Sequence, residues 1–203
     1  TGPGWIIDDI QYSQPGLHNI ENALAATAMA VEAGLETSAI REGLATYEGV
    51  KRRFEYVVNA NGVVYIDDYA HHPTEISACI KAARDFYPGK KITGVFQPHL
   101  FSRTRDLMDG FAESLSALDE VILLPIYPAR ELPIDGVDSE ALLERIPVNQ
   151  KSVCEKENLT ARILNADCEV LLTLGAGDID TLVDPLKKGL ETKYGLITGR
   201  EKV

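Results

Sequence analysis

Ten consecutive residues concentrate two carboxylates, a phenol and two imidazoles: Asp67-Asp68-Tyr69-Ala70-His71-His72-Pro73-Thr74-Glu75-Ile76. Such side chains bind hydroxyls, transfer protons and hold charged substrates. The apolar run at 63–66 before them predicts a buried strand. The apolar residues after them have helical spacing and predict the inner face of a helix: Ile76, Ile80, Ala83 and Phe86. Because open α/β sheets bind ligands at the carboxyl ends of their strands, this turn is a candidate site.

A second polar segment also lies between a predicted strand, at 92–96, and a predicted helix: Gln97-Pro98-His99-Leu100-Phe101-Ser102-Arg103-Thr104-Arg105-Asp106. We expect Ser102 or Thr104 to cap that helix. Arg103 and Arg105 would then lie near the positive end of the helix dipole, where cations are disfavoured. We therefore predict that Arg103 meets a carboxylate or phosphate, which helix amides also attract. The alternative is that both arginines reach solvent or Asp106.

Two further segments could bind phosphate. Lys51-Arg52-Arg53-Phe54-Glu55 places three cations together in an acidic chain, and Arg53 suits bidentate phosphate binding better than Lys51 does. A solvated linker is the alternative. Gly175-Ala176-Gly177 follows a predicted strand and resembles a phosphate-cradling turn, although a strand-to-helix turn needs glycine for its geometry anyway.

Composition limits the function classes. The net charge of −11 over 203 residues argues against a nucleic-acid or anionic-membrane surface. No apolar run approaches membrane-spanning length, and the first residues lack a signal-peptide pattern. The three cysteines are far apart in apolar segments, which disfavours zinc and redox pairs and predicts buried side chains in a cytoplasmic protein: Cys79, Cys154 and Cys168.

The chain divides near Gly49–Lys51. Before this point we expect a short strand at 5–12, a helix capped by Asn19 and stopped by Gly34, and a second helix at 38–47. This part is too short for a core of its own, so we expect residues 1–49 to be the end of a domain that is mostly absent. The absence of an initiator methionine also indicates a cut chain. No G-x-x-x-x-G-K-[ST] loop occurs in this sequence. If the chain handles ATP, the main binding site for the ATP phosphates must therefore lie elsewhere.

After the boundary, strands and helices alternate. Asn61-Gly62 predicts a hairpin between strands at 56–58 and 63–66. Further strands are expected at 92–96, 121–124, 152–154 and 170–174, with helices along 107–118, at 139–146 and 159–164, and from about 179. Pro185 should kink or end the first part of the last helix. This alternation predicts an α/β fold with a doubly wound, mostly parallel sheet.

Four motifs in this order resemble the Mur ligases of bacterial cell-wall synthesis: Pro15 to Ala23, Arg52 to Glu55, Asp67 to Pro73, and Gln97-Pro98-His99 with Ser102 to Arg105. The last segment looks like the member that joins L-alanine to UDP-N-acetylmuramate. The family has a UDP-sugar domain, a central P-loop ATPase domain and a C-terminal Rossmann-like domain. The resemblance implies that 1–49 ends the central domain and that 50–203 is the C-terminal domain.

The family chemistry uses ATP, with Mg²⁺, to phosphorylate the muramate carboxylate, after which the amine of L-alanine attacks the acyl phosphate. The resemblance implies that Asn22 reads the adenine, with His18 and Asn19 nearby. It implies that Arg53 contacts the ATP phosphates and Asp68 the ribose.

The amino-acid pocket would consist of Tyr69, His71, His99 and Arg103, with Arg103 on the alanine carboxylate. Many members carry Arg-Tyr after Gln-Pro-His, where this chain has Leu100-Phe101. One contact to the alanine carboxylate would therefore be missing, and Arg103 would bind that carboxylate with less help. The magnesium ligands would lie in the absent part of the central domain, and the chain by itself would be inactive.

Three alternatives remain open. A ligase that attaches a recycled tripeptide to UDP-N-acetylmuramate shares the Asp67 to Pro73 motif, but the segment from Gln97 to Arg105 argues against it. A metal-dependent hydrolase would use Asp67, Asp68, His71 and His72 as ligands, yet adjacent residues on a turn seldom converge on one ion. An isolated nucleotide-binding or interaction module is the third.

Overall fold

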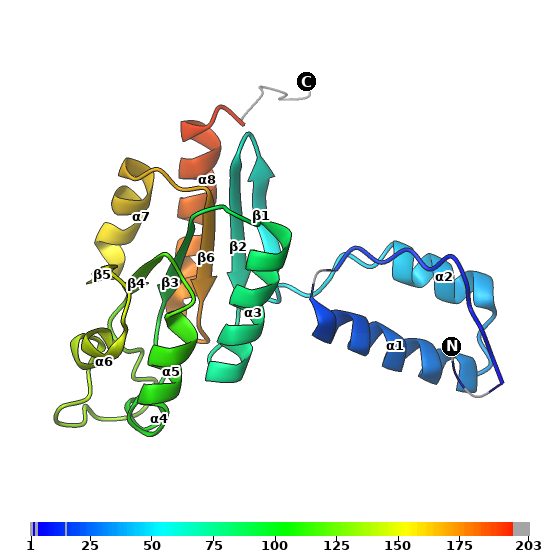
Figure 1. Ribbon diagram of the computed structural model, residues 1–203, viewed down its shortest axis with the longest axis horizontal. Coiled ribbons are helices and arrows are strands. Elements are labelled where there is room, and N and C mark those ends of the chain that lie inside the picture. Colours follow the sequence, from blue (N-terminus) through cyan, green and yellow to red (C-terminus); the bar gives the residue numbers. More distant parts are fainter. Residues whose placement is uncertain (1, 3, 15, 197–203) are drawn as a thin grey trace. The chain divides into compact units, whose positions relative to one another are not determined.

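The computed structural model describes residues 2, 4–14 and 16–196 and contains two compact units, Thr1–Lys51 and Arg52–Val203 (Figure 1). The first unit holds two helices, α1 (Leu17–Glu32) and α2 (Thr37–Ala45). Gly34 has a φ of 78° just after α1, which confirms the predicted stop. Asn19 does not cap α1, because the helix already begins at Leu17 after Gly16. The expected strand at 5–12 is wrong: the described residues there form only an isolated bridge between Gly2 and Trp5.

The second unit is built on a six-stranded sheet of order β1-β2-β6-β3-β4-β5. Its strands are β1 (Glu55–Ala60), β2 (Val63–Asp68), β3 (Ile92–Phe96), β4 (Glu120–Leu123), β5 (Gln150–Val153) and β6 (Val170–Leu174). Only β1 is antiparallel, paired with β2 through the predicted hairpin. Asn61 and Gly62 both have positive φ, at 49° and 83°, as the favoured two-residue turn requires. The mostly parallel α/β fold is therefore confirmed.

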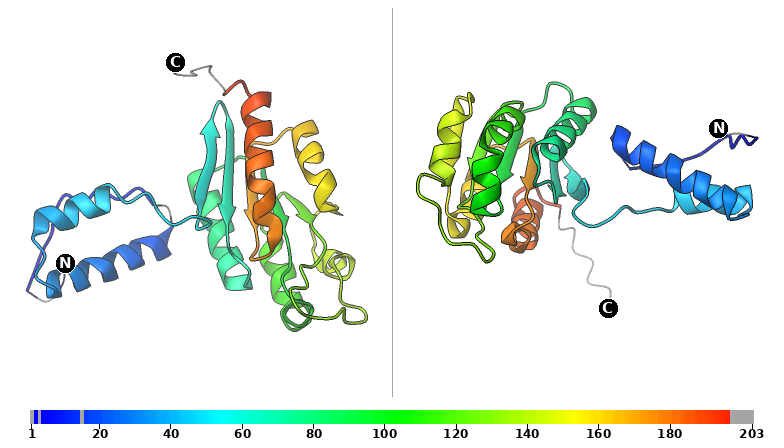
Figure 2. Two further views of the ribbon diagram at one scale, coloured as in Figure 1. Left: turned by 180° about the vertical axis from the view of Figure 1, so that it is seen from behind. Right: turned by 90° about the horizontal axis from the view of Figure 1, so that it is seen from below.

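Helices cover both faces of this sheet (Figure 2). One face carries α3 (Pro73–Phe86), α5 (Met108–Leu115) and α6 (Ser139–Arg145), whose apolar residues share one core cluster. The other face carries α7 (Lys156–Asn165) and α8 (Val183–Lys193), which share the second. From β2 through β3 and β4 to β5, each strand lies further toward one edge of the sheet. The chain then returns to place β6 between β2 and β3. Right-handed crossovers require the helix before that return, α7, to lie on the opposite face.

Two local predictions need correction or refinement. The helix expected to begin at Ser102 or Thr104 and to continue along 107–118 is two elements, the short α4 (Phe101–Asp106) and α5, which meet at Leu107. The last helix is preceded by a 3₁₀ segment, η1 (Asp178–Leu182). The first part therefore ends before Pro185, which lies in the first turn of α8. All three cysteines are buried, as predicted. Within the described residues, no helix is long and apolar enough to cross a membrane.

Candidate functional site

The two polar segments of the sequence meet at the carboxyl edge of the parallel strands. Backbone hydrogen bonds join the turns that leave these strands: Gly175 N donates to Asp68 O at 3.2 Å, and Gln97 N donates to Leu174 O at 3.0 Å. On the far side of β3, Leu100 N donates to Tyr127 O at 2.9 Å. The turns after β2, β6, β3 and β4 thus form one continuous edge, as expected for a ligand site of a parallel sheet.

The two adjacent aspartates have different environments. Asp67 is buried and accepts from Thr173 Oγ1 at 2.6 Å and from Arg52 Nε at 3.1 Å. Asp68 accepts one backbone N–H on each oxygen, from Phe54 at 2.8 Å and from Ala70 at 2.7 Å. Burial raises the pKa of both carboxyls, although these bonds oppose the rise. Asp67 is therefore a structural anchor. Asp68 also forms a side-chain hydrogen bond with the buried Cys79 thiol, so only part of its acceptor capacity remains for a ligand.

The residues after Asp68 divide into an exposed pair and a helix cap. The rings of Tyr69 and His71 meet edge to face, with centroids 5.2 Å apart, and Tyr69 is exposed. His71 Nδ1 lies 3.0 Å from Tyr69 O, and Nε2 takes no part in that contact. His72 caps α3 by accepting from Thr74 N at 3.3 Å, and Glu75 completes the capping box. His72 is therefore committed to the start of α3.

His99 lies at the end of β3 with its ring stacked on Tyr127, at a centroid distance of 5.6 Å and an interplanar angle of 18°. Its Nδ1 is buried and has no hydrogen-bond partner among the described residues. Burial lowers the pKa of His99, the charges of Arg103 and His71 lower it further, and Glu131 opposes this. A cationic ring would need an acceptor for the buried Nδ1–H, so His99 is held as a neutral imidazole. The charges of His71 and Arg103 thus both act on His99.

Arg103 lies on α4, but not where the sequence predicts. Neither Ser102 nor Thr104 caps this helix; Leu100 is the N-cap residue, with a φ of 73° and no side-chain cap bond. Arg103 and Arg105 both fall in its last turn, so the argument that they face the positive end of the helix dipole is wrong. Arg105 pairs with Asp106 at 2.8 Å and is exposed. Arg103 is half-buried, with no ion pair among the described salt bridges, and stays available for an anion.

The cationic segment places its two arginines on opposite sides. Arg53 is exposed, and its charge acts on Asp68, whose pKa it lowers against the effect of burial. Arg52 points inward and pairs with Asp67, which the sequence did not reveal. The sequence offered one signal, since adjacent residues of a turn before an edge strand tend to alternate between buried and exposed positions. The backbone conformation, however, decides which of the two arginines turns inward.

The sequence also did not reveal that Gln97 and Asp178 brace the carboxyl edge of the sheet. Gln97 is buried; its Nε2 donates to Asp178 Oδ1 at 2.8 Å, and its Oε1 accepts from Ile179 N at 2.9 Å. Asp178 also pairs with Lys156 from the start of α7. The position of Gln97 directly after a buried strand was the signal in the sequence.

The glycines after β6 are explained by packing. Gly175 has a φ of 143°, and a Cβ there would lie 2.8 Å from the carbonyl oxygen of Gln97. A Cβ on Gly177 would lie 2.8 Å from the Cβ of Tyr127. The turn therefore needs glycine for its own geometry, and the phosphate-cradle interpretation gains no support from it.

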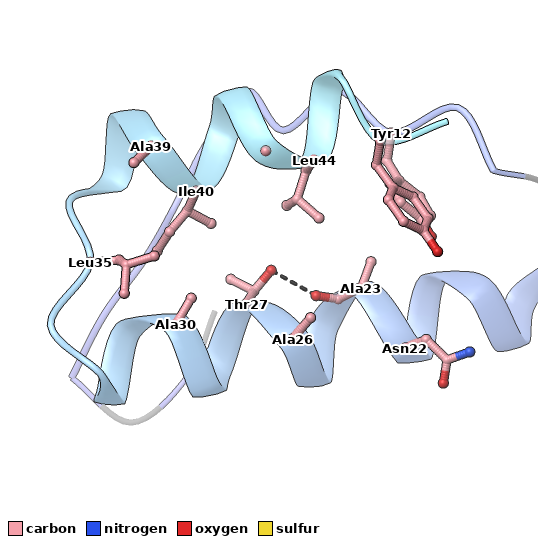
Figure 3. Close-up of a pocket in the computed structure, with 12 residues that line it drawn as sticks. Tyr12, Asn22, Ala23, Ala26, Thr27, Ala30, Leu35, Ala39, Ile40 and Leu44 are labelled. Carbon is pink, nitrogen blue, oxygen red and sulfur yellow. Dashed lines mark hydrogen bonds between the residues drawn. The ribbon is translucent and has the colours of Figure 1, made fainter. Parts of the chain in front are cut away.

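The remaining candidates belong to the first unit. Asn19 and Asn22 lie on α1; Asn19 is half-buried and Asn22 is exposed. His18 is in the same helix, but its side chain lies outside the described part of the chain. Asn22 borders a pocket of about 430 Å³ between the two helices, near Tyr12 (Figure 3). The small residues of α1 face α2 across this pocket, whose other lining residues are Ala23, Ala26, Thr27, Ala30, Leu35, Ala39, Ile40, Gly43, Leu44 and Tyr47.

The geometry gives the hydrolase alternative no support. Asp67 is committed to Arg52 and Thr173, and His72 to the cap of α3. Over the described residues, no group of three or more His, Cys, Asp or Glu side chains is arranged to hold a metal ion.

Comparison with known families identifies the second unit. The sequence profile described as "Mur ligase, glutamate ligase domain" matches residues 52–177. The chain belongs to this family. The match covers the strands, the turns and every candidate residue of the second unit.

Individual relatives are similar over most of the chain. UDP-N-acetylmuramate–L-alanine ligase from Flavobacterium johnsoniae is 50% identical over 188 residues, which are 93% of this chain and 42% of that protein. The enzyme of the same name from Cytophaga hutchinsonii is 50% identical over 192 residues, 95% of this chain and 41% of that protein. A crystal structure of UDP-N-acetylmuramate-alanine ligase from Thermotoga maritima has a TM-score of 0.74 at 28% identity, over 90% of this chain and 40% of that one. This chain thus spans about two fifths of its relatives' length.

Proposed function

We propose that this chain is part of an ATP-dependent ligase that joins L-alanine to the carboxylate of UDP-N-acetylmuramate in peptidoglycan synthesis. The observation that supports it best is the gathering of Tyr69, His71, His99 and Arg103 around the carboxyl edge. The names of the two relatives from Flavobacterium johnsoniae and Cytophaga hutchinsonii point the same way. In this proposal residues 1–49 end a central ATP-binding domain, and 50–203 form the C-terminal ligase domain of a cytoplasmic enzyme.

The reaction has two balanced steps. A carboxylate oxygen of the muramate attacks the γ-phosphorus of ATP, and ADP leaves. The amine of L-alanine then attacks the acyl carbon, inorganic phosphate leaves, and the amine gives up a proton. Positioning and charge stabilisation dominate phosphoryl transfer, so the protein acts mainly by holding these groups in line.

The nucleotide side of the site is proposed to use Asp68 and Arg53. Asp68 accepts backbone N–H groups from Phe54 and Ala70 and bonds to the Cys79 thiol, and its remaining acceptor capacity fits a ribose hydroxyl. Arg53 is exposed beside Asp68 and suits the phosphates. From the first unit, Asn22 would read the adenine edge, with His18 and Asn19 nearby.

The amino-acid side is proposed to use four residues. Arg103, half-buried and without an ion pair among the described salt bridges, would bind the alanine carboxylate. Neutral His99 and His71 would orient the amine and the acyl phosphate, and the exposed ring of Tyr69 would form one wall. The magnesium ligands are proposed to lie in the part of the central domain outside this sequence. Magnesium would neutralise phosphate charge during transfer.

The test is phosphate release by the full-length protein from ATP, UDP-N-acetylmuramate and an amino-acid substrate. Release that depends on L-alanine is expected. Release that depends instead on a tripeptide would favour the recycling ligase. Release without either substrate, together with a metal ion retained after dialysis, would favour a hydrolase.

A further inference from the structure

Arg52 has a partner for every nitrogen of its guanidinium. Nε lies 3.1 Å from Asp67 Oδ2, Nη2 donates to Gly175 O at 2.6 Å, and Nη1 lies 3.6 Å from Asp180 Oδ2. The guanidinium carbon stands 4.9 Å from the centre of the Tyr69 ring. The side chain is only 19% exposed. One arginine therefore contacts the turn after β2, the turn after β6 and η1 at once.

The backbone of Arg52 is fixed as firmly as its side chain. Its carbonyl accepts from Tyr69 N at 2.7 Å, and its N–H donates to Glu55 Oε2 at 2.8 Å. Arg52 and Phe54 both have left-handed backbone conformations, with φ of 61° and 48°. This conformation is strained for residues with a side chain, so the surrounding contacts must over-determine the turn. This turn directs Arg52 inward and leaves Arg53 exposed.

We infer that Arg52 is a positioning residue of the ligase site, which holds the Tyr69 ring against the β6 turn and presents Arg53 outward without contacting a substrate. The inference rests on the proposed function, in which Tyr69 borders the alanine pocket and Arg53 contacts phosphate. Arg52 is the single side chain among the described contacts that touches both the Tyr69 ring and the Gly175 turn.

A lysine cannot replace this arrangement. A guanidinium presents donors in a fixed plane and stacks on an aromatic ring, whereas an ammonium is a compact point charge. Arg52→Lys should therefore keep a cation beside the buried Asp67 but lose the bond to Gly175 O or the stack on Tyr69. Arg52→Ala would leave Asp67 buried and unpaired, which risks unfolding, so the lysine variant is the decisive one.

Arg84 offers a matched control. It also joins a carboxylate and backbone carbonyls, with Nη1 at 2.8 Å from Asp119 and bonds to Ala117 O and Lys90 O. These partners lie where β3 and β4 begin, at the opposite edge of the sheet. Arg84→Lys thus removes the same chemical group from a comparable network that has no part in the site.

The first experiment uses the 203-residue chain. Urea unfolding should give Arg52→Lys and Arg84→Lys similar losses of stability. The NMR resonances of the Tyr69 ring, assigned with Tyr69→Phe, should move in Arg52→Lys and stay in place in Arg84→Lys. Unmoved Tyr69 resonances in a folded Arg52→Lys protein would overturn the inference.

The second experiment measures kinetics in the full-length protein. Arg52→Lys should lower kcat/KM for L-alanine by about tenfold or more, since small misplacements of site residues are costly, while Arg84→Lys leaves it unchanged. Equal losses in the two variants would mean a purely structural role and would overturn the inference. If the wild-type protein shows no alanine-dependent turnover, the proposed function fails, and the NMR comparison still decides whether Arg52 positions Tyr69.

Discussion

The carboxylate of Glu131 caps α4 from 29 residues further along the chain: it accepts from Ser102 N at 2.8 Å and from Ser102 Oγ at 2.5 Å. The helix has no cap of its own, because its N-cap residue is Leu100. The loop after β4 therefore fixes the short helix that carries Arg103. This explains how an exposed loop influences the proposed alanine pocket.

Replacing Glu131 by glutamine should weaken this cap in a pH-dependent way. The bonds from Ser102 lower the pKa of Glu131, so its stabilisation is present above the pKa of the unfolded chain and is lost as pH falls through the lower folded pKa. Glu131→Gln should be less stable than wild type at neutral pH in urea unfolding and equal to it in acid. The exposed Glu144→Gln is the control, and a difference that persists in acid would contradict the role.

Arg103→Ala in the full-length protein should raise the KM for L-alanine by about 10- to 100-fold, because it removes a charge-assisted hydrogen bond to the carboxylate. The KM for ATP should stay near its wild-type value. Arg105→Ala is the matched control, since Arg105 lies two residues away, is exposed and pairs with Asp106. An unchanged KM for alanine in Arg103→Ala would refute the assignment.

The 203-residue chain alone should show no alanine-dependent ATP hydrolysis. Its sequence contains no P-loop, and phosphoryl transfer depends on the positioning and charge stabilisation that such a loop and Mg²⁺ supply. Phosphate release by the purified chain, with and without UDP-N-acetylmuramate and L-alanine, is the measurement. Robust turnover would show that these residues contain the main binding site for the ATP phosphates.

Asp67 should make the chain less stable as pH rises through its folded pKa. Burial raises that pKa above the unfolded value, so the folded state binds the proton more tightly and its advantage is present in acid. The facing groups are Arg52, which opposes the rise, and four others: Glu55, Tyr65, Asp68 and Cys79. In urea unfolding between acid and neutral pH, the stability of wild type relative to Asp67→Asn should fall as pH rises. A rise instead would mean that Arg52 outweighs burial.

Gly175→Ala should be far more harmful than Gly89→Ala. Both glycines have positive φ, 143° and 78°, but only Gly175 is crowded, by the carbonyl of Gln97. The left-handed conformation alone should cost about 1 kcal/mol at Gly89, and overpacking should add about 1–3 kcal/mol at Gly175. Thermal unfolding of the two variants compares them directly, and similar midpoints would show that the Gly175 turn relaxes freely.

Local chemistry allowed much of the second unit to be predicted from sequence. Asn61-Gly62 specifies its hairpin because both residues tolerate positive φ, and His72-Pro73 specifies the start of α3 because proline fits the first helical position. The alternation of apolar strands and amphipathic helices likewise predicted a parallel sheet with polar turns at one edge. These features depend on residues that are neighbours in the chain.

The tertiary structure decided what depends on distant partners. The cap of α4 comes from Glu131, and the insertion of β6 between β2 and β3 brings Gly175 to Arg52. Sequence favoured Arg53 as the functional arginine but could not show that Arg52 turns inward, since its left-handed φ is imposed by bonds to Tyr69, Glu55 and Gly175. The sequence determined which chemical groups are present and in what order. Long-range packing determined which of them anchor the edge and which stay exposed there, because burial and pairing energies arise only once the strands are side by side.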